Sequence, residues 1–430
     1  MPRKPRATPP FLSIIKSTYR QLGPGLITGA SDDDPSGIAT YSQVGAQFGF
    51  GLLWTMLFSF PLMAAIQEIC ARIGRVTGTG ISGNIRRHYP RPLLFGVLAL
   101  LVAANVFNLG ADIGAMAAAL QLLAPGPTEV YVVFFGLVCL VLLVFIPYTK
   151  YVNYLKWLTL VLFAYVAALF SLEVPWSQVF RATVLPSITF HADYFMALVG
   201  VLGTTISPYL FFWQASQEVE EVESHARQKP LREAPQQART QIHRMRVDTY
   251  IGMAVSNLVA YSIIVTSALT LYAHGQRNIQ SAAQAAEALK PLAGNFAFLL
   301  FTLGIIGTGL LAVPVLAGSA AYGVSEAMGW RASLERRPLA ARGFYATITV
   351  ATLIGLALNL LKLDPIKALF WSAVFNGVAA VPLLAVIMFM AGNSKIMGKF
   401  TLPLWLGVLG WTTTIVMIAA SVGFFITLKM

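Results

Sequence analysis

The chain has 430 residues, of which 57% are hydrophobic and 11% are charged. An ordinary soluble protein carries about 25% charged residues, so this composition excludes that class. The net charge of +12 also occurs in nucleic-acid-binding proteins, but here the basic residues gather between long apolar stretches, as in membrane proteins. Only helices and closed barrels cross a bilayer, and these stretches are too long for barrel strands, so we expect an all-α membrane protein.

Eleven apolar stretches follow one another, each near the length of about 20 residues that crosses a bilayer as a helix. Residues 1–21 precede them as a basic, proline-rich segment without a signal-peptide pattern, and we expect a cytosolic tail there. Residues 282–295 predict a short interfacial helix. The approximate bounds of the eleven stretches are 22–47, 50–73, 93–123, 129–147, 152–172, 194–219, 247–273, 293–325, 343–361, 366–391 and 402–428.

The distribution of basic residues predicts the orientation of the chain. With residues 1–21 in the cytosol, most segments rich in arginine and lysine fall on the cytosolic side. This agreement with the positive-inside rule predicts a multi-pass protein of the plasma membrane with a cytosolic N-terminus. The positive charge therefore explains topology, and no nucleic-acid partner is expected. Apart from the lipid bilayer, the sequence indicates no obligatory protein partner.

The first stretch contains a helix-breaking segment in mid-span, "ASDDDPSG". The carboxylates of Asp32, Asp33 and Asp34 are costly in hydrocarbon, and Pro35 interrupts a helix. The backbone groups freed by such a break are tolerated only where protein or water surrounds them. Because Gly37 makes a turn easy, we expect two half-helices joined by a short unwound segment near the bilayer centre.

The sixth stretch carries a similar segment, "GTTISPYLFF", in which Thr204 and Ser207 precede Pro208. Two interrupted helices five spans apart are typical of a LeuT-like inverted-repeat transporter, which holds its substrate where the breaks meet. For the sixth stretch alone, a simple proline kink is an equally good interpretation. The expected transporter domain covers 22–430, with five-helix repeats at 22–172 and 194–391 and an extra helix at 402–428.

The polar groups at these breaks indicate a cation as substrate. Asp34 offers a carboxylate, Thr204 and Ser207 offer oxygens, and Asn376 in the tenth stretch offers an amide oxygen. An all-oxygen set with net negative charge suits a hard ion such as Mg²⁺, Ca²⁺ or Mn²⁺. The neighbouring carboxylates of residues 32 and 33 are expected to line a vestibule and to concentrate cations there.

Two further groups of polar residues occur within apolar stretches. Asn105, Asn108 and Asp112 follow at i, i+3 and i+7, so they share one helix face. That face either lines a path for water or ions or bonds neighbouring helices. Glu68 and Arg72 are four residues apart, which predicts a local ion pair near the cytosolic end of the second stretch.

At these residues the sequence resembles the NRAMP family of divalent metal transporters, from residue 22 to about 390. "GPGLITGASDDDPSGIAT" is similar to the family's first-helix stretch with its Asp-Pro-Gly-Asn motif, and "GTTISPYLFF" to the sixth-helix stretch with Met-Pro-His. "ARIGRVTGTGISGNIRRHYP" is similar to the segment after the second helix. The resemblance implies two inverted five-helix repeats with a further helix or two, and transport of Mn²⁺, Fe²⁺ and related ions, usually with protons.

The resemblance makes Asp34 the metal-binding aspartate and Thr204 the donor of a backbone carbonyl. Gly37 stands where the family has an asparagine ligand, Ser207 where it has a methionine ligand, and Tyr209 where it has a histidine. Losing the thioether removes the soft ligand that favours transition metals. The chain therefore resembles the branch of the family associated with Mg²⁺, an ion that sheds its water reluctantly.

The resemblance to the family also bears on whether transport is coupled to protons. The family's acidic positions in the third helix appear here as Asn108 and Ala111, with Asp112 one step along. Without those acids and the sixth-helix histidine, transport is expected to run without protons. A relay through Asp112 would restore the coupling.

The sequence thus predicts a secondary transporter of divalent metal cations that works by alternating access and needs no cofactor. The favoured ion is Mg²⁺, with Mn²⁺ as a further substrate. One alternative is a proton-coupled Mn²⁺/Fe²⁺ importer. Another is an amino-acid or other solute transporter on the same fold, although the acidic cluster repels carboxylates. No nucleophile–base pair, nucleotide loop or hydrolase motif indicates an enzyme.

Overall fold

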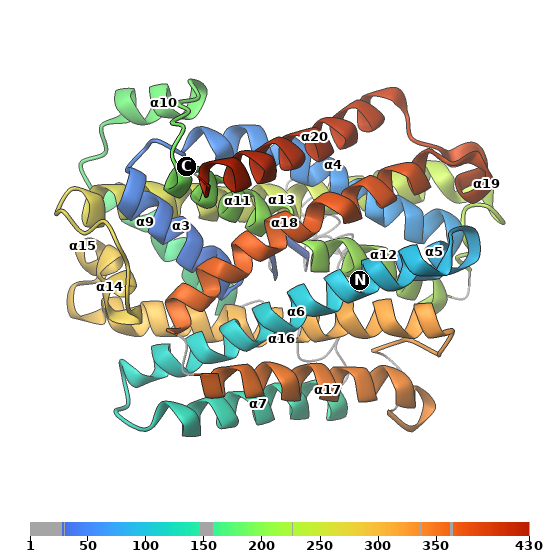
Figure 1. Cartoon of the computed structure of the whole chain (residues 1–430), viewed down its shortest axis with the longest axis horizontal. Coiled ribbons are helices and arrows are strands. Elements are labelled where there is room, and N and C mark those ends of the chain that lie inside the picture. The colour runs from blue at the N-terminus through green and yellow to red at the C-terminus, as the bar shows by residue number, and fades with distance from the viewer. Residues whose placement is uncertain are drawn as a thin grey trace, which may run out of the picture.

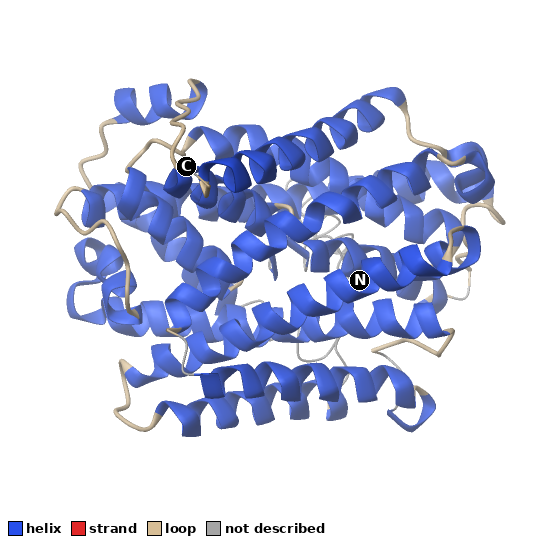
Figure 2. Ribbon diagram, viewed as in Figure 1, coloured by secondary structure: helices blue, strands red, loops and turns tan. Residues whose placement is uncertain are grey.

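The computed structural model describes residues 28–29, 31–146, 158–225, 227–334, 338–361 and 364–429. Within these ranges the regular elements are helices joined by loops, and no strand occurs there (Figure 2). The prediction of an all-α protein is therefore confirmed. The tail predicted at 1–21 lies outside the described residues.

Nine helical stretches in the described part of the chain are long and apolar enough to cross a membrane. They correspond to the second to fourth and the sixth to eleventh predicted stretches. The first and fifth predicted stretches lie partly outside the described residues. Their described parts include α3 (Pro35–Phe48) and α9 (Phe163–Ser171). The remaining long helices are α4 (Trp54–Thr77), α6 (Arg91–Gln121), α7 (Thr128–Phe145), α11 (Ala192–Thr205), α12 (Pro208–Ser224), α13 (Ala238–Ser267), α16 (Ala297–Met328), α17 (Arg342–Leu358), α18 (Pro365–Gly392) and α20 (Leu404–Thr427).

Short helices lie at both ends of the bundle. They are α5 (Ile81–His88), α10 (Trp176–Val184), α14 (Ala282–Ala286), α15 (Lys290–Ala293) and α19 (Ser394–Met397). In Figure 1, α5 and α19 lie at the right end and the other three at the left end. The helix expected at 282–295 is present, although it is divided into α14 and α15. Hydropathy does not predict α5 and α10, because they are much shorter than a membrane span.

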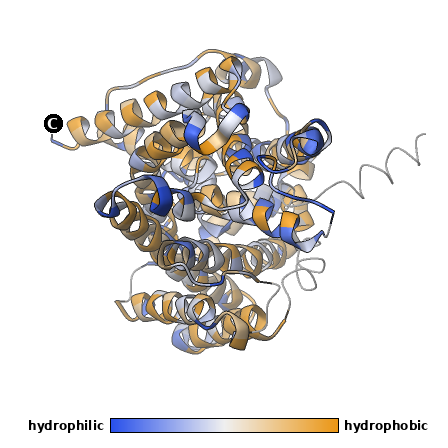
Figure 3. Ribbon diagram, turned by 90° about the vertical axis from the view of Figure 1, so that its right-hand side faces the viewer, coloured by the Kyte–Doolittle hydropathy of each residue, from blue (hydrophilic) through white to orange (hydrophobic). Residues whose placement is uncertain are grey.

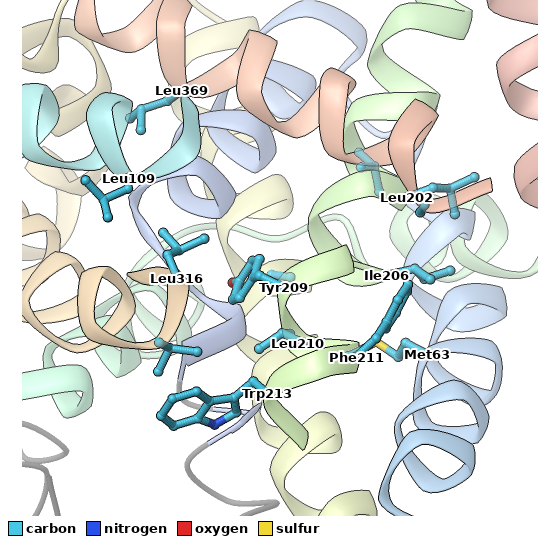
Figure 4. Close-up of a cluster of buried hydrophobic side chains, with 14 of the residues drawn as sticks. Met63, Leu109, Leu202, Ile206, Tyr209, Leu210, Phe211, Trp213, Leu316 and Leu369 are labelled. Carbon is cyan, nitrogen blue, oxygen red and sulfur yellow. The ribbon is translucent and has the colours of Figure 1, made fainter. Parts of the chain in front are cut away.

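The long helices pack so that the interrupted ones lie inside the bundle. α6 and α16 lie side by side, α7 and α17 run along one edge, and α3 packs against α13 and α18 (Figure 1). Figure 4 shows Leu109 of α6, Leu316 of α16 and Leu369 of α18 on one side of the junction between α11 and α12. These leucines are buried, so the junction lies in the hydrophobic core.

Glycines permit the closest approach between helices. A side chain at Gly203 of α11 would collide with the backbone of Ala373 and Gly377 in α18. A side chain at Gly74 of α4 would collide with the backbone of Ala215 in α12. Small residues at such crossings are typical of membrane helices, where packing drives association. The first of these contacts places α18 directly beside the break in the sixth predicted stretch.

One end of the bundle, which carries α5 and α19, is rich in arginine, and we call it the basic end. Figure 3 views the molecule from this end and shows hydrophilic segments in its loops and short helices, with hydrophobic helices around them. The basic residues predicted for one side of the membrane therefore gather at one end of the fold. The arginines that define the basic end are Arg75, Arg86, Arg87, Arg232 and Arg246.

Ion pairs tie helices together at the basic end. Arg75 of α4 and Glu218 of α12 form a salt bridge of 2.6 Å, and both side chains are only 1% exposed. Glu68 pairs with Arg72 at 2.9 Å, as the spacing predicts, and also with Arg246 of α13 at 3.1 Å. The local pair is thus part of a link between two helices.

Candidate metal-ion site

The first predicted break lies at Asp34. Its backbone is extended (φ −69°, ψ 172°), and α3 begins at the next residue, Pro35. Aspartate is a favoured N-cap and proline a favoured first helical residue, so the dipeptide is well suited to start a helix. The Asp34 side chain completes the cap by accepting a hydrogen bond from the Gly37 amide at 2.8 Å. The predicted interruption of the first helix is confirmed.

The second predicted break lies between α11 and α12. Ser207 separates the two helices and is extended (φ −81°, ψ 132°), and Pro208 is the first residue of α12. The Ser207 hydroxyl contacts two carbonyl oxygens of the preceding turn, those of Gly203 at 2.9 Å and Thr204 at 2.6 Å. The sixth stretch is therefore interrupted, and its serine hydroxyl donates to the turn before the break.

The two breaks face each other. A Cβ atom at Gly37 would lie 3.1 Å from the methyl group of Thr204, so the two segments are in van der Waals contact. The Tyr209 hydroxyl donates to the carbonyl oxygen of Ser31 at 2.9 Å and lies 3.5 Å from Oδ2 of Asp34. Figure 4 shows Tyr209 at the α11–α12 junction. The structure thus brings Asp34, Gly37, Thr204 and Tyr209 together.

The Asp34 carboxylate is fully buried and is surrounded by neutral donors. Oδ1 accepts hydrogen bonds from Ser36 Oγ at 2.6 Å and from the Gly37 amide at 2.8 Å. Oδ2 accepts one from Asn108 Nδ2 of α6 at 2.9 Å. The Asn108 Oδ1 atom accepts in turn from Ser372 Oγ of α18 at 2.6 Å. Because Oδ1 already accepts twice, Oδ2 is the oxygen with a lone pair left for a cation or a water molecule.

The two preceding carboxylates are turned towards α13. Ser256 Oγ lies 2.6 Å from Oδ2 of Asp32 and 3.1 Å from Oδ1 of Asp33. Asp32 is fully buried and Asp33 is 4% exposed, so neither carboxylate is open to solvent in this structure. The reason is that the interrupted helix packs against α13, which covers both side chains.

Asp112 is a fourth buried carboxylate of this region. It lies beside the backbone of Ser36, and neither of its oxygens makes a hydrogen bond of regular geometry. Among the described residues, no arginine, lysine or histidine forms an ion pair with any of these four aspartates. The middle of the bundle therefore concentrates acidic groups without a basic partner.

Several buried oxygens near the breaks have no hydrogen-bond partner among the described residues. They include Thr204 Oγ1, Asn376 Oδ1 of α18 and Thr40 Oγ1 of α3. Buried oxygens are normally satisfied by protein, water or an ion, so these atoms are suitable acceptors for water molecules around an ion. Asn376 is not among the hydrogen-bond partners of Asp34.

The described groups that contact the Asp34 carboxylate are neutral. Among them, none carries a sulfur or an imidazole. In the described part of the chain, no three histidine, cysteine, aspartate or glutamate side chains converge closely enough to hold a metal ion. A cation at Asp34 would therefore meet one carboxylate with neutral polar groups around it.

A cavity of about 240 Å³ lies at the end of α3 remote from Asp34. Its lining includes Ala39, Gln43 and Gln47, which follow one face of α3 at spacings of four residues. Gln43 Oε1 accepts a hydrogen bond of 2.8 Å from the Ile279 amide, which holds the loop before α14 against α3. The cavity therefore marks an approach to α3 from the end opposite the basic end, and this loop borders it.

Three residues in the hydrogen-bond network around these aspartates were not foreseen as parts of it. Asn108 was placed on a polar face of the third stretch, and the structure shows that this face meets Asp34. Ser372 carries one weak signal, its spacing of one helical turn from Asn376 in the same stretch. The contact of Ser256 with residues 32 and 33 has no sequence signal, since serine is common in membrane helices.

A family model described as "Natural resistance-associated macrophage protein-like" matches residues 25–427. The chain belongs to the Nramp family. Members of this family are transporters and not enzymes, so the predicted family and the absence of an enzyme function are confirmed. Among curated relatives, the divalent metal cation transporter MntH of Klebsiella pneumoniae is 26% identical over 406 residues, which cover 93% of this chain and 92% of MntH.

Solved structures agree with this fold. The manganese transporter of Eremococcus coleocola has a TM-score of 0.74 at 20% identity and covers 97% of this chain and 88% of its own. MhsT in complex with L-phenylalanine has a TM-score of 0.62 at 12% identity, covering 93% and 98%. Mhp1, a nucleobase-cation-symport-1 family transporter, has a TM-score of 0.57 at 13% identity, covering 93% and 91%. The LeuT-like architecture with interrupted first and sixth helices is therefore confirmed, and the Nramp chain is a multi-pass membrane transporter.

Proposed function

We propose that this Nramp transporter carries hard divalent cations, Mg²⁺ in the first place and Mn²⁺ as a further substrate, by alternating access and without protons. Asp34 is the central ligand and acts through Oδ2. Thr204, Ser207 and Asn376 supply oxygens directly or through water, and Gly37 leaves room for water molecules of the ion. Asp32, Asp33 and Asp112 add negative potential around the path.

The main support for this proposal is that the groups that contact the Asp34 carboxylate are neutral and contain no sulfur. A thioether or an imidazole would favour a transition metal, and neither contacts this carboxylate in the described residues. Among the described residues, no three histidine, cysteine, aspartate or glutamate side chains converge, which also fits an ion that retains part of its hydration shell. Asn108 in place of an acid leaves α6 with fewer groups able to move a proton beside Asp34.

The second candidate is a proton-coupled Mn²⁺ or Fe²⁺ importer. It is favoured by the relatives, which are named as a divalent metal cation transporter and a manganese transporter. Asp112 would then carry the proton, since it is buried near Asp34 and its oxygens lack regular hydrogen bonds. Transport of an amino acid has support only from the shared fold of MhsT, and the buried carboxylates would repel its carboxylate.

The two inverted repeats and the plasma-membrane location belong to the same proposal. The arginines of the basic end support an orientation in which that end faces the cytosol. The cavity beside Gln43 would then face outside and admit the ion.

The test is ion uptake into proteoliposomes that contain the purified protein. Mg²⁺ and Mn²⁺ are supplied at equal concentration, and an internal dye records pH. Mg²⁺ entry without acidification of the lumen supports the proposal. Mn²⁺ entry that excludes Mg²⁺ and acidifies the lumen overturns it in favour of the second candidate.

A further inference from the structure

We infer that Asn108, held by Ser372, is a positioning residue that takes the place of the cation at Asp34 during the return of the ion-free carrier. The inference rests on the proposed function only in requiring Asp34 to bind a divalent cation. It assigns to α6 and α18 a role in the part of the cycle in which no ion is carried.

The amide nitrogen of Asn108 donates to Oδ2 of Asp34, the carboxylate oxygen that has a lone pair left for a cation. Oδ1 of Asp34 accepts from Ser36 and Gly37, which belong to the first turn of α3 itself. Oδ2 accepts a hydrogen bond from Asn108 Nδ2 at 2.9 Å. The Tyr209 hydroxyl is 3.5 Å away, and its proton has a closer acceptor in the Ser31 carbonyl.

Ser372 supports this amide at the end remote from Asp34. Its hydroxyl lies 2.6 Å from Asn108 Oδ1 and 2.7 Å from the carbonyl oxygen of Leu369, one turn earlier in α18. The Asp34 carboxylate requires a donor, so Nδ2 faces Asp34 and Oδ1 is left to Ser372, whose hydroxyl can either donate or accept. Both Asn108 and Ser372 are at most 1% exposed, so water does not compete for these bonds.

A divalent cation on the second lone pair of Oδ2 would lie beside the N–H group of Asn108, which is the positive end of the amide dipole, and would weaken this hydrogen bond. A half-turn of the amide would present Oδ1 to the ion instead. Nδ2 would then donate to Ser372 Oγ, and the serine proton would go to the Leu369 carbonyl that it already contacts. In that orientation Asn108 no longer donates to Asp34, so its donation belongs to the ion-free site.

Donation by Asn108 matters when the carrier returns without an ion. A buried carboxylate oxygen without a hydrogen-bond donor raises the free energy of the ion-free state, and this penalty is larger for a charged group. Asn108 removes this penalty without a proton or a basic residue. It therefore accelerates the ion-free return and has no such role when the carrier returns with an ion bound.

The experiment compares net uptake with exchange in proteoliposomes, both at saturating ion. Net uptake uses vesicles without divalent cations and requires the ion-free return, whereas exchange uses vesicles filled with the same ion and does not. For Asn108→Ala, we expect the ratio of net uptake to exchange to fall about tenfold or more, because the loss in the ion-free return adds to any loss that both modes share. Ser372→Ala should change the ratio in the same direction by a smaller factor.

Asn105→Ala is the matched control. Asn105 lies one turn away on α6, is equally buried and donates to the Leu316 carbonyl at 3.0 Å, without contact to Asp34. It should leave the ratio of the two modes unchanged, whatever its effect on folding. An equal loss of both modes in Asn108→Ala, or no loss in either, overturns the inference.

Mg²⁺ and Mn²⁺ are tested in parallel, so the comparison is made with the ion that the unmodified protein carries. Transport of Mn²⁺ alone contradicts the Mg²⁺ preference, but the ratio of net uptake to exchange still decides the role of Asn108. The failure of one proposal is thereby separated from the failure of the other.

Discussion

Asp34 starts a helix and, in our proposal, binds the transported ion. The helix role is visible in its hydrogen bond to the Gly37 amide and in the proline that follows it. The ion-binding role depends on the charge of the same side chain. Because an asparagine also caps helices well, the two roles can be separated by one substitution.

Asp34→Asn should abolish transport and leave the fold intact. The substitution keeps the cap and the shape of the side chain but removes the charge, which is worth about 3 kcal/mol, or roughly 100-fold in ion binding, at short range in a partly polar site. Initial rates of Mg²⁺ uptake and the melting temperature of the detergent-solubilised protein measure the two effects. Retained uptake in a correctly folded variant would remove Asp34 from the site.

Ser207→Met should shift the ion preference towards Mn²⁺. A thioether at the start of α12 adds a soft ligand that the described partners of Asp34 do not supply, and we expect the ratio of Mn²⁺ to Mg²⁺ uptake to rise by about tenfold. Ser207→Ala is the control, because it removes the hydroxyl without adding sulfur. If both variants change the ratio equally, the missing thioether does not explain the preference.

At the scale of elements, the contact between α11 and α18 determines how tightly the site is built. The backbones touch at Gly203 and Gly377, one residue from Thr204 and Asn376 respectively. Two candidate ligands are therefore positioned by one helix crossing. Any separation of these helices would move both oxygens away from Asp34 or towards it.

Gly203→Ala should destabilise the protein by about 1–3 kcal/mol, because the added methyl group meets backbone atoms of α18 that cannot move independently. Gly200→Ala is the matched control on the same helix. Its methyl group would have side-chain atoms at 3.5 Å as nearest neighbours, which is ordinary contact, and should leave stability nearly unchanged. Thermal unfolding in detergent micelles measures both, and equal melting temperatures would contradict the close packing.

The features that could be predicted from sequence are those encoded by neighbouring residues. An aspartate before a proline in an apolar stretch has few structural solutions, so the break at Asp34 was predictable, as was the one before Pro208. The contact of Asn108 with Ser372 joins positions 264 residues apart and depends on how α6 packs on α18, so no local pattern contains it. The contact of Asp32 with Ser256 depends in the same way on the packing of α13, so no local pattern contains it either.

For the whole molecule, the buried pair of Arg75 and Glu218 connects α4 to α12 at the basic end. Arg75 also donates to Gln228 at 2.6 Å, in the segment between α12 and α13. The pair thus joins the second predicted span, the half-helix after the second break and the following loop. A rigid connection at this end would leave the opposite end, with the cavity beside Gln43, freer to change.

Arg75→Met should destabilise the fold by about 3–5 kcal/mol, because Glu218 is left as an unpaired buried charge. Changing both residues to methionine removes the charge together with its partner, so the double variant should unfold at a higher temperature than Arg75→Met. Melting curves of the three proteins in one detergent decide this. A double variant that is less stable than the single one would show that the ion pair itself stabilises the fold.

The hydrogen bonds at Asp34 have an electrical consequence. Each partner at regular distance is a donor, which is the pattern of an ionised carboxylate. Whatever the charge of the neighbouring aspartates, the site that carries a divalent cation has two more positive charges than the ion-free site that returns. A membrane potential that is negative inside therefore favours the complete inward cycle by about 2.3 kcal/mol per charge for each 100 mV across the full membrane. A cell could thus accumulate the ion without a proton gradient.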